Sequence, residues 1–278
     1  MKYFQCGRYR FRVEGEQARP LVMGILNVTP DSFSDGGRYD SVPAAISRAE
    51  VMIREGVDII DIGAESSRPG AGAVSLQEEL DRIMPVIEAL RDCGRPLSVD
   101  TYKPEVMTAV LASGVDMIND ICGFSREESL NAVASYDCGL CVMHMQGEPG
   151  TMQDNPRYGD VVAEVSDFLA RQVASLLSVG VAHNRICIDP GFGFGKTLDD
   201  NLTLLRQLDR VGERLDLPVL AGLSRKSVVG ALTGKPVGER LAGNLAIALS
   251  AVSHGACIVR VHEVGETVDA LNVWLATR

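Results

Sequence analysis

The sequence predicts an α/β protein, a (β/α)8 TIM barrel that follows a short N-terminal β-hairpin, and three observations lead to this fold. Eight short apolar runs recur along the 278 residues, each long enough for one buried strand and too short for a free-standing helix. The runs are rich in Val, Ile and Leu throughout, which is typical of parallel strands covered on both faces. Helical segments alternate with them. Eight such units in this length indicate a closed barrel, and a doubly wound open sheet is the alternative that the pattern leaves open.

The chain begins with an alternating segment, residues 3–13, which predicts the hairpin. Its apolar residues alternate with Arg8, Arg10 and Arg12, and Gly7 supplies the turn. A solvated strand face explains the three arginines better than an anion-binding patch does.

The apolar runs define the barrel strands. The first of them is apolar up to the amide of Asn27, and a loop rich in Pro, Gly, Ser and Asp follows it. The predicted strands are 21–27, 57–63, 96–100, 115–119, 139–143, 185–189, 218–222 and 256–260.

Apolar residues at helical spacing predict the helices. Segment 160–179 is the clearest, with valines, leucines and Phe168 recurring every three or four positions. The predicted helices are 42–55, 76–92, 103–113, 127–136, 160–179, 242–254 and 264–276. Since no break in composition marks a boundary, residues 1–278 are predicted to form a single domain.

The composition bounds the partners and the location. The net charge is −10, so binding to nucleic acid or to an anionic membrane is disfavoured, whereas a small anionic ligand responds to local charge. No apolar run reaches the length of a membrane span, and the first residues lack the apolar stretch of a secretion signal. The seven cysteines are an odd number in apolar surroundings, which indicates reduced thiols. We therefore expect a cytoplasmic protein.

Polar residues stand at the carboxyl end of every predicted strand. In a barrel of this type these ends point into one shared mouth. The residues are Asn27, Asp61, Asp100, Asn119, His144, Asp189, the Ser224-Arg225-Lys226 group, and Arg260 with His262. Any one of them could merely cap the next helix, but a complete ring indicates a binding site.

The ring divides by charge. Asp100, Asn119 and Asp189 suit the donor-rich edge of a flat heterocycle. Residues two apart on a strand point the same way, so Arg260 and His262 are expected to face one ligand, such as a phosphate or a diphosphate. The sequence thus predicts an acidic pocket for a flat ring beside a basic pocket for a phosphate or a diphosphate.

Three other sequence features are weak evidence for a functional site. Segment Gly191–Lys196 resembles a phosphate-binding P-loop, but Pro190 stands where the first glycine is required, so a tight turn near a ligand is the milder interpretation. Cys138 and Cys141 have the spacing of a redox or zinc pair, but an extended strand would send the two sulfurs to opposite faces, which favours structural burial. His183 follows a helix end and is predicted at the surface.

Five motifs, in the family's order, resemble the dihydropteroate synthase family. They are Gly24–Gly37, Asp61–Gly70, Asp189–Lys196, Gly222–Ser227 and Arg260–His262. The resemblance runs from about Leu21 to the last helix, with one mild departure at Ser67, where many relatives carry Thr. The long loops 28–39 and 64–73 are candidate lids beside the mouth.

The resemblance implies a fold and an activity. Members of this family are TIM barrels, usually homodimers. They join 4-aminobenzoate to 6-hydroxymethyl-7,8-dihydropterin pyrophosphate, with Mg²⁺, and form 7,8-dihydropteroate and pyrophosphate in folate biosynthesis. Sensitivity to sulfonamides is also expected.

The resemblance further implies residue roles. The residues expected to hold the pterin are Asp100, Asn119, Asp189 and Lys226, in a pocket lined by Met143, Phe194 and Gly222. Those expected to hold the pyrophosphate are Asn27, Arg260 and His262, with Asn27 on the Mg²⁺ side. Those expected to shape the 4-aminobenzoate site are Ser67, Arg68, Pro69, Phe33 and Ser227. The expected catalytic residues are Asp35, which would face the reacting carbon, Lys226, Arg260 and His262.

Two other functions remain as alternatives. A pterin-dependent methyltransferase would share the barrel and the pterin contacts, but the Arg260 and His262 pair would then have no pyrophosphate to meet. A non-catalytic pterin-binding homologue would not need Asn27, both loops and Lys226 together.

Overall fold

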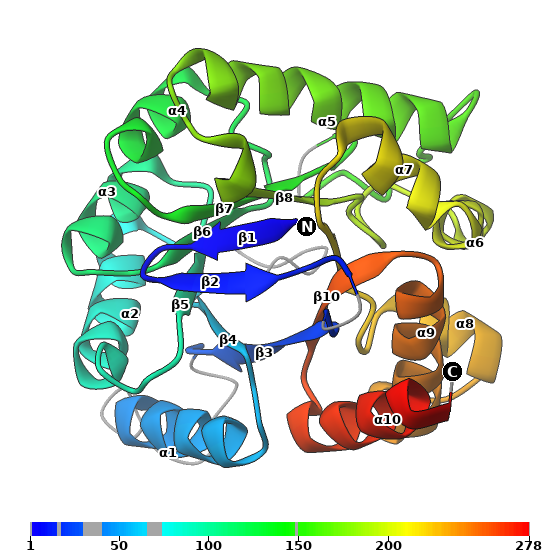
Figure 1. Cartoon of the computed structure of the whole chain (residues 1–278), viewed down its shortest axis with the longest axis horizontal. Coiled ribbons are helices and arrows are strands. Elements are labelled where there is room, and N and C mark those ends of the chain that lie inside the picture. Colours follow the sequence, from blue (N-terminus) through cyan, green and yellow to red (C-terminus); the bar gives the residue numbers. More distant parts are fainter. Residues whose placement is uncertain (1, 16–17, 30–40, 66–73, 148–149, 278) are drawn as a thin grey trace.

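The structure, a computed structural model, describes residues 2–15, 18–29, 41–65, 74–147 and 150–277. The barrel strands are β3 (Leu21–Asn27), β4 (Ile59–Gly63), β5 (Leu97–Asp100), β6 (Met117–Asp120), β7 (Gly139–Met143), β8 (Ile186–Asp189), β9 (Val219–Ala221) and β10 (Ala256–Val261). They pair in parallel and close in the order β10-β3-β4-β5-β6-β7-β8-β9, with helices around them (Figure 1). Closure confirms the predicted barrel and excludes the open sheet.

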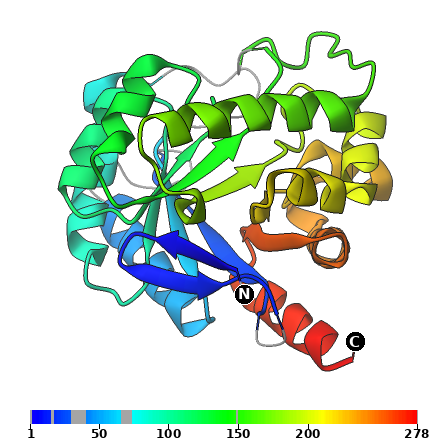
Figure 2. The ribbon, with the colours of Figure 1, turned by 45° about the horizontal axis from the view of Figure 1, so that its top comes forward.

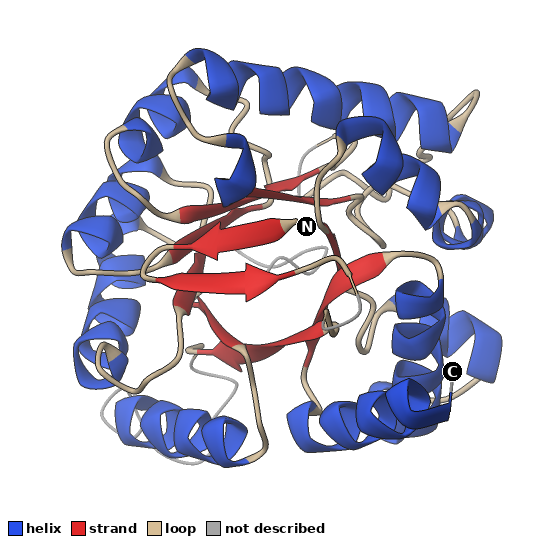
Figure 3. Cartoon of the chain, viewed as in Figure 1, coloured by secondary structure: helices blue, strands red, loops and turns tan. Residues whose placement is uncertain are grey.

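Helices form the outer ring, as Figure 3 shows. They are α1 (Ser41–Arg54), α2 (Leu76–Leu90), α3 (Pro104–Ala112), α4 (Glu127–Ala134), α5 (Val161–Ser178), α6 (Leu198–Arg206), α7 (Leu208–Leu215), α8 (Ser227–Thr233), α9 (Leu241–Ser253) and α10 (Val264–Thr277), with 3-10 turns at His183–Arg185 and Val237–Glu239. Sequence analysis missed α6, α7 and α8. Each has only two or three buried residues, which is too few to establish a helical period.

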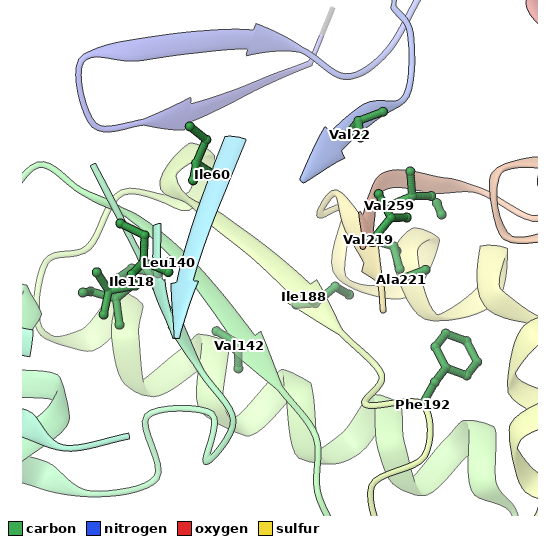
Figure 4. Close-up of a cluster of buried hydrophobic side chains, with 14 of the residues drawn as sticks. Val22, Ile60, Ile118, Leu140, Val142, Ile188, Phe192, Val219, Ala221 and Val259 are labelled. Carbon is green, nitrogen blue, oxygen red and sulfur yellow. The ribbon is translucent and has the colours of Figure 1, made fainter. Parts of the chain in front are cut away.

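Side chains alternate along each strand between the barrel interior and the helices. On β3, Leu21 and Met23 belong to the interior cluster, whereas Val22 and Leu26 belong to the larger cluster that packs under the helices. Figure 4 shows part of this outer cluster, with Val22, Ile60 and Val259 projecting from their strands. The alternation shifts once, between Ala256 and Ile258 of β10, and elsewhere the register sets the last inward residue of each strand.

The hairpin closes the amino-terminal end of the barrel. Its strands, β1 (Tyr3–Cys6) and β2 (Tyr9–Arg12), pair antiparallel and lie across the end of the barrel in Figure 1. Figure 2 shows the same hairpin from a second angle, below the barrel strands. Phe4 and Cys6 are fully buried against the interior cluster. The hairpin therefore serves as the floor of the barrel.

The basic face of the hairpin is engaged with the protein itself. Arg8 forms an ion pair with Asp116, at 3.0 Å, and the Arg10 guanidinium lies 3.9 Å from the centre of the Tyr3 ring. Arg8 and Arg10 are exposed, as a solvated face requires. The structure therefore supports the solvated face over an anion site.

The cysteines and His183 lie as the sequence predicts. All seven cysteines are free thiols. Cys138 packs in the outer cluster and Cys141 in the interior one, so their sulfurs do face opposite sides of the barrel wall. His183 is exposed. Among the described residues, none of the helices combines the length and apolar content that crossing a membrane requires.

Candidate active site

A cavity of about 590 Å³ opens at the carboxyl ends of the strands. Eight of the predicted site residues line it: Asn27, Asp100, Phe194, Gly222, Lys226, Ser227, Arg260 and His262. Three of them lie on the strands β3, β5 and β10, four lie in the loops after β8, β9 and β10, and Ser227 is the first residue of α8. The ring of polar strand ends is therefore one site in space.

The register explains why these side chains meet. Asn27, Gly63, Asp100 and Asn119 are neighbours in one row across β3 to β6. Gly63 leaves a slot in that row, because a Cβ atom there would lie 3.7 Å from Asp100 Cβ and 3.9 Å from Asn27 Oδ1. Asn27 and Asp100 thus place side-chain oxygen atoms on the two sides of the gap at Gly63.

Arg260 is held by two carboxylates. Its Nε atom lies 2.6 Å from Asp61 Oδ2 and an Nη atom lies 2.8 Å from Asp100 Oδ2. Burial opposes the charge of Arg260, yet these carboxylates raise its pKa above the ordinary value, so it stays a cation. Burial also raises the pKa of Asp100, which Arg260 partly offsets. Asp61 is fully buried and accepts a further bond from Asn119 Nδ2, at 3.3 Å.

Asp189, Lys226 and Arg260 converge at Gly222. A Cβ atom on Gly222 would lie 3.7 Å from Asp189 Oδ2, 3.8 Å from Lys226 Nζ and 3.9 Å from Arg260 Cβ. Burial lowers the pKa of Lys226 to about 8 and raises that of Asp189. Glycine at this position therefore keeps open the point where the charged groups meet.

One wall of the site is apolar. Phe194 lines the cavity and clusters with Met143, Met152 and Ile121. The Lys226 ammonium lies 4.5 Å from the centre of the Phe194 ring, and it donates a hydrogen bond to the carbonyl of Phe192. Such a wall suits the face of a flat ring whose edge meets Asp189.

His262 is oriented by a hydroxyl and a carboxylate. Its Nδ1 atom lies 2.9 Å from Ser224 Oγ, and Ser224 Oγ lies 3.1 Å from Glu263 Oε2. Arg225 Nε donates to the other oxygen of Glu263, at 2.6 Å. Val261 packs outward, so Arg260 and His262 face the cavity together, as the strand period predicts.

Acidic and basic side chains are mixed within the site. The sequence had predicted an acidic pocket separate from a basic one, and this expectation is wrong. In the structure Arg260 lies directly on Asp61 and Asp100, and Lys226 lies beside Asp189. Because the interior of a barrel is narrow, Arg260 on β10 reaches carboxylates on β4 and β5, strands that do not pair with β10, and forms ion pairs with them.

Some predicted residues lie elsewhere. Asn119 and Asp189 are buried just beneath the cavity, and His144 packs against Lys196 instead of facing the mouth. Five others lie outside the described residues: Phe33, Asp35, Ser67, Arg68 and Pro69.

Sequence reasoning missed several residues that line the cavity, among them Glu65, Gln153 and Arg240. Glu65 is held by Lys103, at 2.5 Å, and by the Tyr102 hydroxyl, at 3.0 Å. Arg240 donates to the carbonyls of the loop after β9. Glu65 lies within the Asp61–Gly70 motif but was assigned no role there, whereas Gln153 and Arg240 lie outside all five motifs.

The site fits Mg²⁺ that arrives with a phosphate-bearing ligand. Within the described part of the chain, His, Cys, Asp and Glu form no group of three that could hold a metal. Asn27 contributes one amide oxygen beside the Gly63 slot. Since Mg²⁺ commonly binds through one or two protein ligands, waters and phosphate oxygens, this sparse donor set suits it.

The closed barrel and its mixed-charge mouth define an enzyme of the TIM-barrel class. The family model described as "Pterin binding enzyme" matches residues 23–262. The chain is also 48% identical over 261 residues to the dihydropteroate synthase of Escherichia coli K12, covering 94% of this chain and 92% of the relative.

Solved structures agree with this match. The dihydropteroate synthase of Burkholderia cenocepacia, complexed with 7,8-dihydropteroate, is 54% identical with a TM-score of 0.91, covering 100% of this chain and 96% of the other. That of Xanthomonas albilineans, with 4-aminobenzoic acid, is 48% identical with a TM-score of 0.91, covering 99% and 97%. The chain belongs to the dihydropteroate synthase family.

Proposed function

We propose that this chain catalyses the reaction of its family, the condensation of 4-aminobenzoate with 6-hydroxymethyl-7,8-dihydropterin pyrophosphate to 7,8-dihydropteroate and pyrophosphate, and that its residues act as follows. The observation that carries the proposal is the convergence of Asp189, Lys226 and Arg260 at Gly222, beside an apolar wall. Asp189 can accept from N–H donors on the edge of a flat ring, and Arg260 can bind an adjacent diphosphate. The apolar wall can contact the face of the ring.

The pterin is bound by acceptors at its edge and by apolar contact on its face. Asp189 and Asn119 hold the edge, and Phe194 and Met143 support the ring. As the bond between the methylene carbon and the diphosphate oxygen breaks, positive charge spreads into the pterin, where Asp100 and Asp189 stabilise it.

The diphosphate leaves toward Arg260 and His262. The electron pair of the breaking C–O bond departs with the diphosphate oxygen, the amine nitrogen of 4-aminobenzoate bonds to the methylene carbon, and the nitrogen gives up one proton. Arg260 and His262 meet the departing anion. Asn27 would hold Mg²⁺, which when bound would neutralise further charge on the diphosphate.

Ser227 begins α8 and is proposed to help place the carboxylate of 4-aminobenzoate. Asp35, Phe33, Ser67, Arg68 and Pro69 keep the roles expected from the family resemblance. Sulfonamides, which resemble 4-aminobenzoate, are proposed to compete for the same site. Positioning of the amine supplies much of the rate, because little proton transfer is needed.

We further propose a homodimer in the cytoplasm. Helix α9 supports the dimer: its thirteen residues carry no charge, and Leu241, Ala242 and Ala246 are exposed on its outer face. A helix that is apolar on all sides is normally covered. The free thiols agree with a reducing compartment.

A turnover assay tests the proposal. The purified chain with both substrates and Mg²⁺ is expected to release pyrophosphate and form 7,8-dihydropteroate, and added sulfonamide is expected to raise the apparent KM for 4-aminobenzoate. Chelation of Mg²⁺ should suppress release. Absence of pyrophosphate from all of these mixtures would refute the reaction, and methyl transfer from a folate to a corrinoid protein would favour the methyltransferase alternative.

A further inference from the structure

A buried lysine lies behind the site, enclosed by the chain itself. Lys196 is 3% exposed. Its Nζ atom lies 2.9 Å from the carbonyl of Gly191, 3.0 Å from that of Phe194 and 2.9 Å from His144 Nδ1. These contacts enclose the ammonium with acceptors that carry no formal charge.

His144 is a neutral acceptor in this arrangement. Burial, with Lys196 as the next contribution, lowers the pKa of His144 to about 3, and the ring packs edge-on against Phe168 with the centroids 5.0 Å apart. Nδ1 accepts from the ammonium, so the ring proton is on Nε2. Burial also lowers the pKa of Lys196 to about 7.

The glycines of the motif make this enclosure possible. Gly191, Gly193 and Gly195 have φ values of +70°, +78° and +59°, which favour glycine. A Cβ atom on Gly191 would lie 1.8 Å from the carbonyl oxygen of His144, and one on Gly195 would lie 2.5 Å from that of Gln146. The segment that resembles a phosphate loop is therefore a carbonyl-lined loop closed on its own lysine.

The same loop supports the residues that face the pterin. Asp189 Oδ1 accepts from the backbone N–H of Gly191 at 2.7 Å, the Phe192 carbonyl accepts from Lys226, and Phe194 forms the apolar wall. Lys196 itself is not among the residues that line the cavity. Its influence on the ligand must therefore pass through these neighbours.

We propose that Lys196 is a positioning residue: its ammonium fixes loop 190–196 and helps to keep the carboxylate of Asp189 ionised for the pterin. This inference rests on the proposed function, because it takes Asp189 to be the pterin acceptor. Asp189 is buried, and burial favours its protonated form, so the cations around it decide whether it can accept two N–H groups of a ligand.

The charges facing the two groups come from several elements. Around Asp189 these are Lys226 after β9, Lys196 after β8 and Arg260 on β10, all of which lower the pKa of the carboxyl against the effect of burial. Around Lys196 these are Asp189, Lys226 and Asp200 of α6, together with neutral His144. Since Lys226 and Arg260 also line the cavity, Lys196 is the cation whose charge can be removed without touching the ligand.

The test measures binding of 6-hydroxymethylpterin by calorimetry between pH 5 and 9. Lys196→Gln removes the charge and keeps two N–H donors, whereas Lys196→Met removes both. In each variant the acidic limb of the binding profile is expected to move up by about one pH unit, because Asp189 now protonates more easily. At pH 8, where Lys196 is mostly neutral but still donates N–H bonds to the loop carbonyls, Lys196→Met is also expected to lose about tenfold in affinity through loss of loop order. Lys235→Met, at an exposed lysine, is the matched control and should leave the profile unchanged.

Several outcomes would overturn the inference. An acidic limb that stays in place in both folded variants, or that moves equally in Lys235→Met, contradicts the role of the charge. If Lys196→Met does not fold, Lys196→Gln still tests the role of the charge, and a measurement on the ligand-free wild type tests the enclosure. In that measurement, ¹⁵N NMR is expected to find His144 neutral and protonated on Nε2 at pH 5. A doubly protonated ring would refute the enclosure. A wild type that binds no pterin while His144 behaves as expected would instead refute the proposed function.

Discussion

Asp61 illustrates what single residues contribute to this site. It lies on β4 inside the barrel, fully buried, and aims Arg260 by accepting its Nε–H. Asp100 takes an Nη–H of the same guanidinium, so two carboxylates fix the plane of Arg260 before any ligand enters. A guanidinium held in this way presents its remaining donors at a defined place, which is what binding a diphosphate requires.

Removal of Asp61 should therefore cost stability as well as function. Asp61→Ala leaves Arg260 without its most deeply buried partner, and the free energy of unfolding is expected to fall by about 3 kcal/mol in urea titrations. Asp167→Ala is the control, because Asp167 and Arg214 form a half-exposed ion pair, worth less than about 1 kcal/mol. Equal losses in the two variants would contradict the assigned role of Asp61.

At the scale of elements, the hairpin and the loops have separate tasks. The hairpin packs Phe4 and Cys6 into the interior cluster at the amino-terminal end, and the cavity is at the opposite end of the strands. The floor thus contributes stability, whereas the proposed chemistry belongs to the carboxyl ends of the strands and the loops that follow them.

Truncation in the hairpin tests this separation. Phe4→Ala is expected to lower the free energy of unfolding by about 3 to 4 kcal/mol, with kcat per folded molecule unchanged, as measured by urea unfolding and turnover. Its cross-strand neighbour Phe11 is only partly buried against the same cluster, so Phe11→Ala should cost less. A large fall in kcat for Phe4→Ala at full folding would show that the floor and the mouth are coupled.

At the scale of the whole molecule, the cations gathered at the site contrast with the negative net charge of the chain. A chain with a net charge of −10 concentrates Lys226, Arg260 and His262 around one cavity. The surplus of acidic residues is spread over the rest of the molecule, and the local cations meet the anion at short range. The outer face of α9 is the other whole-molecule feature, because an uncharged helix remains exposed there.

The proposed dimer can be tested on that face. The wild type is expected to sediment as a dimer, and Ala246→Arg, which places a charge on the exposed side of α9, is expected to sediment as a monomer with unchanged circular dichroism. Ala182→Arg, at an exposed position before the His183–Arg185 turn, should remain dimeric. A dimeric Ala246→Arg variant would place the interface on another face, and a monomeric wild type would refute the dimer.

Prediction from sequence succeeded where the determining signal is local. All eight barrel strands are apolar runs, and the period of two along β10 predicts that Arg260 and His262 face the same side. It failed for α6, α7 and α8, whose stability comes from docking and from caps such as the Thr197–Asp200 capping box. It also missed Glu65 and Arg240, which reach the cavity through contacts with Lys103 and with the loop after β9.

By itself the sequence determined the barrel, the order of its eight strands, and the polar residues at the strand ends, since burial and strand period are properties of neighbouring residues. Only the tertiary structure decided how those residues pair. It brought Arg260 onto Asp61 and Asp100, residues 199 and 160 positions away along the chain, and it enclosed Lys196 within its own loop. The ion pairs of Arg260 depend on the distances from β10 to β4 and β5, strands that do not pair with it in the sheet, and no local pattern of residues encodes those distances.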